Sequence, residues 1–335
     1  MEEAHKTNIE MGRVGLIEKR KAPTLKAFTV DFMAAIENQC AGKPRTVEFY
    51  RSRAKTLADS PLGNKPLDAI DEEAIEKYRQ QRSASISRRK LTLSPASVNR
   101  ELATLRRMLR MAHEHKILNR VPRVKLLRGE KHREFTLPHD KEDLYLAALP
   151  EPLNDVALIL LDTGLRLGEL TSMHWQQVHL EPVSSAKFGY LTVLAGKAKS
   201  GKSRNVPLSV RAVEALRRQG TARDGLVFRR ADGKALERSL LGQQQKRVRD
   251  VLKLPADFVL HSLRHSFGTR LGEAGADAFT IMRLMGHSTV TVSQRYVHPS
   301  PKAVELAYER FTELNKSKVG SVSGTVLKSD LDQLQ

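Results

Sequence analysis

Residues 261–267 read HSLRHSF, and this pattern predicts a helix with an unusual set of side chains. A helix has about 3.6 residues per turn, so His261, Arg264 and His265 fall on one face, one turn apart. Two histidines four residues apart also fit a zinc site, but no acidic side chain or third ligand accompanies them here. Arginine binds phosphate oxygens in pairs, so this face favours a phosphate site over a metal site.

Two neighbouring runs carry further candidate side chains. The run TGLRLGEL places Arg166 at the start of a helix, three residues before Glu169. The run LMGHSTVTVSQRY carries His287 after a glycine and ends at Tyr296. Taken singly, each has a plainer interpretation: a surface arginine, a structural histidine and a half-buried packing tyrosine. Only the combination of these runs, in this order, indicates a particular kind of site.

A hairpin is predicted between these runs. Residues 190–194 alternate in polarity like a β-strand, and a second strand is expected at 205–208. The segment 196–202 between them reads GKAKSGK, a basic turn that contains glycine. Apolar helices are predicted at 144–149 and 156–161. Further helical patterns begin near Val210, Glu237, His261, Asp277 and Pro301. The fold class is therefore expected to be mainly α with a small antiparallel β-sheet.

The N-terminal half predicts a smaller helical unit. Helical signals begin at Thr24, and Asp71 and Ser94 are expected to cap helices, with a proline following Ser94 at the first turn. The first helix presents an apolar face that consists of Leu25, Phe28, Phe32 and Ile36. The last and clearest helix has the apolar stripe Val98, Leu102, Leu105, Leu109 and Ala112.

The chain is strongly basic. Lys and Arg number 57 against 38 Asp and Glu, a formal net charge of +19 at pH 7. Such a charge repels itself unless a polyanion is the usual partner, and nucleic acid is the first candidate because counterion release drives binding. Four arginines lie off the apolar stripe of the last helix: Arg100, Arg106, Arg107 and Arg110. They form either an ordinary solvated face or a contact surface for double-stranded DNA.

Composition excludes several classes of protein. Cys40 is the only cysteine, so neither a disulfide framework nor a cysteine-rich metal site is possible. The longest aliphatic stretch, 156–161, is far too short to cross a bilayer, and no apolar N-terminal segment resembles a signal peptide. A cytoplasmic protein without a membrane partner is expected.

Cleavage of a phosphodiester needs a nucleophile, positive charge on the non-bridging oxygens and a proton for the leaving oxygen. Metal enzymes meet the last two needs with divalent ions held by carboxylates. The C-terminal half offers no such cluster of Asp and Glu, so cationic side chains would replace the metal. No G-x-x-x-x-G-K-[ST] run is present either. The expected chemistry uses no metal, no ATP and no cofactor.

The order of these motifs resembles the tyrosine recombinases, the phage integrase family. An Arg with Glu three residues on, a Lys in a hairpin turn, H-x-x-R, Gly-His and then Tyr occur between about residues 138 and 299. The resemblance implies a site-specific recombinase or integrase that cleaves and rejoins DNA strands through a 3′-phosphotyrosyl intermediate. It further implies a two-domain, C-shaped clamp that assembles as a tetramer on DNA.

The resemblance assigns the central chemistry to three residues. Tyr296 would be the nucleophile, and Arg166 and Arg264 would bind the non-bridging oxygens of the scissile phosphate. Positive charge there is expected to favour the phenolate over the hydroxyl of a free tyrosine, whose pKa is about 10. Glu169 would brace the site from behind. One departure is Gly268, where the family more usually has alanine; this is expected to loosen the helix without touching the chemistry.

The remaining implied roles concern protons and hydrogen bonds. Lys199 would protonate the departing 5′ oxygen, and it is preferred over Lys197 and Lys202 because its distance from the second strand matches the family's pattern. His261 would shuttle the proton of the nucleophile. His287 would add a hydrogen bond to the phosphate.

The resemblance also divides the chain into parts. Residues 1–22 would be a flexible arm, 23–120 a helical core-binding domain that contacts DNA, and 121–136 a linker. Residues 137–316 would form the catalytic domain. Residues 317–335 would be a linker and a tail helix, either a frayed terminus or a segment that docks on a neighbouring protomer through three leucines.

Two other functions are consistent with these sequence features. A type IB topoisomerase-like enzyme would relax supercoils with the same catalytic side chains. A non-catalytic DNA-binding relative would have kept the fold alone, which fits less well because the candidate side chains are all present.

Overall fold

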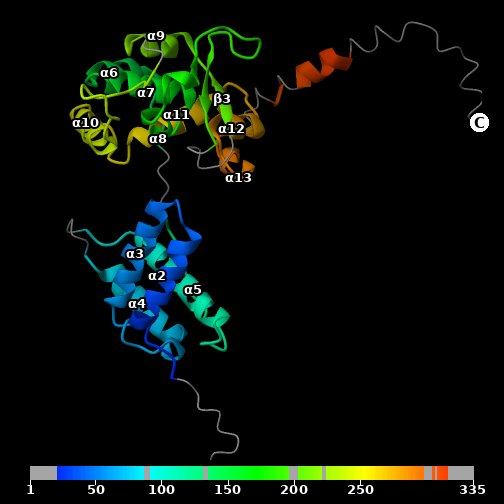
Figure 1. The fold of residues 1–335 in the computed structure, drawn as a ribbon. Helices are drawn as coiled ribbons and strands as arrows, with labels where there is room; N and C mark the ends of the chain where they lie inside the picture. The colour runs from blue at the N-terminus through cyan, green and yellow to red at the C-terminus, as the bar shows by residue number, and fades with distance from the viewer. Residues whose placement is uncertain are drawn as a thin grey trace, which may run out of the picture. The chain divides into compact units, whose positions relative to one another are not determined.

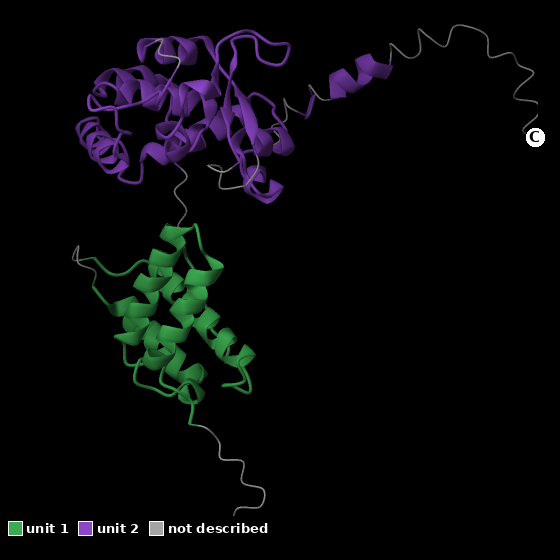
Figure 2. Ribbon diagram, viewed as in Figure 1, with its two compact units in different colours: residues 1–132 green, residues 133–335 purple. Residues whose placement is uncertain are grey.

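The computed structural model divides the chain into two compact units, residues 1–132 and 133–335 (Figure 2). Each unit has its own hydrophobic core. The boundary falls inside the segment 121–136, and the functional division of the chain stays a prediction. The structure describes residues 21–86, 91–130, 135–195, 203–220, 224–297, 304–305 and 308–315. Within those ranges no helix is both long and apolar enough to cross a membrane.

Unit 1 is helical. Its elements are α2 (Leu25–Gln39), α3 (Pro44–Ala58), the short 3-10 helix η1 (Leu67–Ala69), α4 (Glu72–Ala84) and α5 (Pro95–Glu114). Helix α5 packs against α2, α3 and α4, and the predicted apolar faces of α2 and α5 are buried (Figure 1).

The predicted helix starts in unit 1 are confirmed. The side chains of Thr24, Asp71 and Ser94 each accept a hydrogen bond from the backbone N–H three residues on. Each cap satisfies one of the N–H groups that lack a partner at a helix N-terminus. Local side-chain chemistry therefore defines where α2, α4 and α5 begin.

Unit 2 combines helices with a small sheet (Figure 1). Its elements are η2 (His139–Lys141), α6 (Glu142–Ala148), α7 (Leu153–Thr163), α8 (Leu167–Thr171), η3 (Trp175–Gln177), β1 (Val178–His179), β2 (Tyr190–Val193), β3 (Arg204–Pro207), α9 (Val210–Arg218), α10 (Arg238–Val251), α11 (Leu260–Glu273), α12 (Ala278–Met285) and α13 (Val290–Gln294). Helix α7 packs against α11 and α9, whereas α12 packs against β3 and α13.

The predicted hairpin is confirmed, and the fold is mainly α with a small antiparallel sheet. Strands β2 and β3 pair antiparallel with Leu191 opposite Val206. The sequence did not predict β1, which pairs with β2 through two residues only. The prediction of an apolar helix at 144–149 was wrong in one respect, because Leu144 is 61% exposed on α6.

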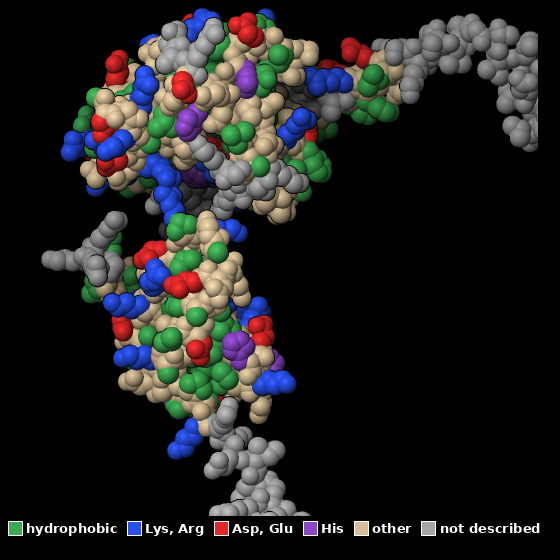
Figure 3. Space-filling model, in the orientation of Figure 1, with side chains coloured by type: hydrophobic (Ala, Val, Ile, Leu, Met, Phe, Trp, Pro, Cys, Tyr) green, Lys and Arg blue, Asp and Glu red, His purple; other side chains and the backbone are tan. Residues whose placement is uncertain are grey.

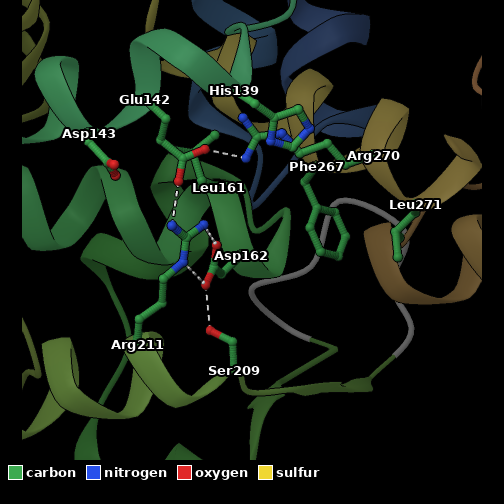
Figure 4. Close-up of a pocket in the computed structure, with 10 residues that line it drawn as sticks. All are labelled: His139, Glu142, Asp143, Leu161, Asp162, Ser209, Arg211, Phe267, Arg270 and Leu271. Carbon is green, nitrogen blue, oxygen red and sulfur yellow. Dashed lines mark hydrogen bonds and ion pairs between the residues drawn. The ribbon is translucent and has the colours of Figure 1, made fainter. Parts of the chain in front are cut away.

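A network of ion pairs joins α6 to α7, α9 and α11. Figure 4 shows the Glu142 carboxylate between the guanidinium groups of Arg211 and Arg270, while Arg211 also binds Asp162. These side chains line a cavity of about 440 Å³. Burial would raise the pKa of Glu142, but hydrogen bonds from the two arginines outweigh it and lower the pKa. The network therefore ties α11, which carries the HSLRHSF run, to three other helices.

Candidate active site

Arg166 is positioned by a turn at the end of α7. Gly164 closes that helix with φ +60, and a Cβ there would lie 2.2 Å from the ring of Phe267. Glycine is therefore needed to turn the chain into α8. The backbone N–H of Arg166 donates to Glu169 Oε2 at 2.9 Å, and its Nη1 donates to Glu169 Oε1 at 2.9 Å. Both bonds orient the guanidinium group from the first turn of α8.

Arg264 lies deep in unit 2, with 3% of its surface exposed. Its Nη1 donates to the carbonyl of Gly164, and its Nη2 donates to the carbonyl of Met285 at 2.7 Å. Burial, together with the positive charge of Arg166, lowers the pKa of Arg264 to about 9. Neutral carbonyls do not compensate this positive charge, so an anion would be stabilised beside it.

Arg166 and Arg264 are brought together at the end of α12. Arg166 Nη2 donates to the carbonyl of Gly286 at 3.0 Å, next to the Met285 carbonyl that binds Arg264. Gly286 has φ +67 and ends α12 in the left-handed conformation. The structure thus places the two predicted phosphate-binding arginines on adjacent backbone carbonyls.

Arg204 is a member of this cluster that the sequence reasoning missed. Its Nη2 donates to Glu169 Oε2 at 2.7 Å, and its Nε donates to the Leu284 carbonyl at 2.9 Å. Glu169 therefore lies between Arg166 and Arg204. Burial would raise the pKa of Glu169, but hydrogen bonds and charge from Arg204, joined by Arg166, lower it. Nothing in the alternating β3 segment distinguished Arg204 from the chain's many other arginines.

Tyr296 is buried, with 6% of its surface exposed, and its hydroxyl contacts a histidine that the sequence reasoning left without a role. Tyr296 Oη lies 2.7 Å from His265 Nδ1. The predicted proton shuttle, His261, meets the ring of His265 edge-on, with ring centroids 5.0 Å apart. The His287 ring stacks on Tyr296 at 6.2 Å, with 15° between the planes. Of the two histidines in the HSLRHSF run, His265 makes the hydrogen bond to the Tyr296 hydroxyl.

Two glycines of α11 make room for Tyr296. A Cβ at Gly268 would lie 2.9 Å from the Tyr296 ring, and one at Gly272 would lie 1.9 Å from the Tyr296 carbonyl oxygen. Gly268 was expected to loosen the helix without touching the chemistry, and the structure places it directly beside the ring of the candidate nucleophile. Glycine at both positions lets Tyr296 approach the backbone of α11 this closely.

The protonation of the two rings follows from burial. Burial raises the pKa of Tyr296 and outweighs the opposite effect of Arg264 and Arg295. The charge of Arg264 favours the phenolate, as expected, but burial has the larger effect in the protein alone. Burial lowers the pKa of His287 to about 3, helped by Arg264 and Arg166, and its Nδ1 lies 2.8 Å from Ser293 Oγ. His287 is consequently neutral at pH 7.

Lys199, and with it Lys197 and Lys202, lies outside the described residues, as do most of the predicted arm and the whole predicted tail. Among the described residues, no group of three or more His, Cys, Asp and Glu side chains is arranged to hold a metal ion.

The four predicted DNA-contacting arginines of α5 separate into different surroundings. Arg107 donates to Tyr50 Oη at 2.8 Å and lies over its ring, so it packs against α3. Arg106 and Arg110 line a groove of about 840 Å³ within unit 1. Arg100 is exposed elsewhere on the helix. This basic groove is lined by Arg79, Arg106, Arg110, Arg123, Lys125 and Arg128, together with apolar residues of 121–127.

The chain is similar in sequence to a known family and to several known proteins. Residues 136–303 match the phage integrase family. Tyrosine recombinase XerD of Lacticaseibacillus casei is 30% identical over 236 residues, covering 65% of this chain and 78% of that protein. Tyrosine recombinase XerC of Xanthomonas campestris is 27% identical over 284 residues, covering 80% and 82%.

Solved structures share the fold. The Tn1549 transposon integrase in complex with a circular intermediate DNA has a TM-score of 0.70 at 19% identity, covering 86% of this chain and 99% of that chain. A lambda integrase dimer bound to a COC′ core site has a TM-score of 0.67 at 21% identity, covering 88% and 85%.

Proposed function

This chain belongs to the phage integrase family of tyrosine recombinases, and we propose that it cleaves and rejoins DNA strands through a covalent bond between Tyr296 and a backbone phosphate. The observation that carries the assignment is the convergence of Arg166 and Arg264 on the adjacent carbonyls of Met285 and Gly286. Helix α11 links the parts, because it carries Arg264 and also borders the Tyr296 ring.

The positive charge of the cluster supports a phosphate as its ligand. Arg166, Arg204 and Arg264 converge around a single carboxylate, Glu169, which leaves the cluster with a net positive charge. A phosphate would replace the carbonyls as acceptor, and each guanidinium could donate two parallel hydrogen bonds to its oxygens. Glu169 would hold Arg166 in place rather than touch the phosphate. His287, neutral and adjacent to Tyr296, would donate a further hydrogen bond.

The leaving 5′ oxygen needs a proton, and we assign it to Lys199 in the turn between β2 and β3. The support is indirect: Arg204, the first residue of β3, donates to Glu169 in the site, and Lys199 precedes Arg204 by five residues in the sequence. The resulting ester keeps the energy of the phosphodiester bond. Rejoining would then need no ATP.

DNA contact by unit 1 is proposed to occur at the basic groove. Figure 3 shows Lys and Arg side chains spread over the visible face of both units with Asp and Glu among them, so net charge alone does not locate the contact. The groove gathers six basic side chains in one concave surface, of which Arg110, Arg123, Lys125 and Arg128 are exposed. We therefore keep Arg106 and Arg110 as proposed DNA contacts, and Arg100 as an exposed candidate outside the groove. We assign Arg107 to packing.

Assembly on DNA is also a proposal. Lambda integrase has been solved as a dimer on a core site and as a tetramer on a Holliday junction. Exchange between two duplexes requires four strand cuts, so we expect this chain to act as a tetramer on double-stranded DNA, in the cytoplasm. Neither a type IB topoisomerase-like activity nor a non-catalytic DNA-binding role is favoured, since the relatives are named tyrosine recombinases.

The proposal is tested with nicked duplexes that trap a covalent protein–DNA adduct. Wild-type protein should form the adduct in EDTA, and Tyr296→Phe should form none while binding DNA normally, because only the nucleophilic oxygen is lost. Residual adduct in Tyr296→Phe would place the nucleophile elsewhere, with Tyr308 the next candidate. A strict requirement for Mg²⁺ would overturn the metal-free mechanism.

A further inference from the structure

Among the described residues, His265 is the neighbour that the hydroxyl of Tyr296 contacts and that could take its proton. His265 Nδ1 lies 2.7 Å from Tyr296 Oη, within the distance that proton transfer needs. His265 follows Arg264 on α11, so one helix positions both a phosphate-binding group and this ring. His261 is exposed, and its ring meets the ring of His265 edge-on at 5.0 Å between centroids.

We propose that Nδ1 of His265 is the general base that accepts the Tyr296 hydroxyl proton during strand cleavage. This rests on the proposed function. As Tyr296 Oη forms its bond to phosphorus, the Oη–H bond breaks and the proton passes to Nδ1. The bond from phosphorus to the 5′ oxygen breaks, and that oxygen takes a proton from the general acid, proposed as Lys199. Rejoining reverses both transfers.

The surroundings explain why a base is needed and why it is not another group. Burial raises the pKa of Tyr296, so its hydroxyl keeps the proton at neutral pH until attack. His287 Nδ1 is occupied by Ser293 Oγ. Among the described residues, the charged and titratable groups near His265 include His261 and Arg264 on α11 and His287 and Tyr296 beside it, and Arg295 acts on both His287 and Tyr296.

The proposal requires His265 to be neutral, with its hydrogen on Nε2 so that Nδ1 accepts. Cleavage should therefore decline toward acidic pH as His265 becomes protonated. His261, at the exposed end of the histidine pair, would exchange the proton with solvent.

The first test measures single-turnover adduct formation on a nicked duplex between pH 5 and 9. His265→Gln keeps a hydrogen-bond acceptor but not a base, so it should cleave about 100-fold or more slowly at neutral pH. Its cleavage rate should also no longer fall toward acidic pH. Added imidazole should partly restore His265→Ala. The matched control is His139→Gln, an exposed histidine of unit 2, which should cleave like wild type.

The second test separates base from acid with DNA that carries a sulfur in place of the bridging 5′ oxygen. A thiolate leaves without a proton, so this substrate should rescue Lys199→Ala but not His265→Gln. Rescue of His265→Gln by the sulfur substrate would overturn the assignment. So would a slow His265→Gln variant whose rate still falls toward acidic pH as in wild type. The assignment would also be overturned if only His261→Gln abolished that fall in rate.

The two proposals fail differently. If wild-type protein makes a Tyr296-dependent adduct and His265→Gln makes it equally fast, only the role of His265 is overturned. If wild-type protein makes no such adduct, the proposed function falls and the base assignment falls with it.

Discussion

Gly268 lies directly against the ring of Tyr296, so close that a Cβ at this position would be 2.9 Å from two ring carbons. The tyrosine ring is fixed at one end by its own backbone and at the other by the Oη–Nδ1 hydrogen bond to His265. A shift of the ring would therefore move the hydroxyl away from His265. The Tyr296 ring of this chain thus occupies space that a side chain at position 268 would share, although the family more usually has alanine there.

Gly268→Ala should displace Tyr296 and slow adduct formation, with a cost in stability of about 1–3 kcal/mol from overpacking. Thermal unfolding and single-turnover cleavage would measure the two effects. Gly242→Ala on α10 is the matched control, because nothing lies within 4 Å of a Cβ there and alanine should stabilise that helix. Equal cleavage by Gly268→Ala and wild type would show that the ring adapts freely.

Replacing Arg166 or Arg264 by alanine should cost on the order of 3 kcal/mol of transition-state stabilisation, comparable to the loss of one oxyanion donor. Arg→Lys should rescue poorly, since a single ammonium cannot reproduce two parallel donors. The measurement is the rate of adduct formation at saturating protein. Lysine variants that cleave like wild type would contradict paired binding of the phosphate oxygens.

Glu169→Gln should destabilise unit 2 by roughly 3–5 kcal/mol at pH 7, because two arginines lose their shared carboxylate partner. The pKa of Glu169 is lower in the folded protein, so its contribution is present above the unfolded pKa of about 4.3 and is lost as pH falls through the folded value. The stability difference between wild type and Glu169→Gln should therefore shrink below about pH 4.3. Denaturant unfolding at several pH values measures it, with Glu181→Gln as an exposed control.

Neutralising Arg110, Lys125 and Arg128 together should weaken DNA binding and reduce its salt dependence. Each lost phosphate contact lowers the slope of log K against log salt by about 0.9, so a loss of up to about 3 is expected. These three side chains are exposed in the basic groove, so their removal should leave the fold intact.

A triple alanine variant of exposed lysines outside the groove, Lys26, Lys55 and Lys77, controls for the loss of net charge. It should change the slope less than the groove variant. Equal slopes in the two variants would place DNA contact elsewhere on unit 1.

Truncation after Asn315 should leave binding to a single site intact while weakening synapsis and strand exchange. The helical residues 308–315 expose Tyr308, Phe311 and Leu314, and the predicted apolar edge of the tail follows them in sequence. A helix of about ten residues cannot persist in water without packing against something. A truncated protein that recombines at the full-length rate would show the tail to be dispensable.

The sequence by itself determined most of the helices, the hairpin of β2 and β3, and the choice of Arg166, Arg264 and Tyr296 as candidates. Helix caps at Asp71 and Ser94 and the alternation of 190–194 are local properties, set by neighbours within a few residues. The spacing in HSLRHSF places Arg264 on the same helix as two histidines, whatever surrounds that helix.

Only the tertiary structure decided which groups meet. His261 and His265 are equivalent by helical spacing, and the packing of Tyr296 against α11 gives the hydrogen bond to His265. Arg204 joins the site because β3 lies beside α12, a long-range contact without a local signal. The pKa of Tyr296 also depends on burial, which is a property of the assembled core and outweighs the nearby arginine charge.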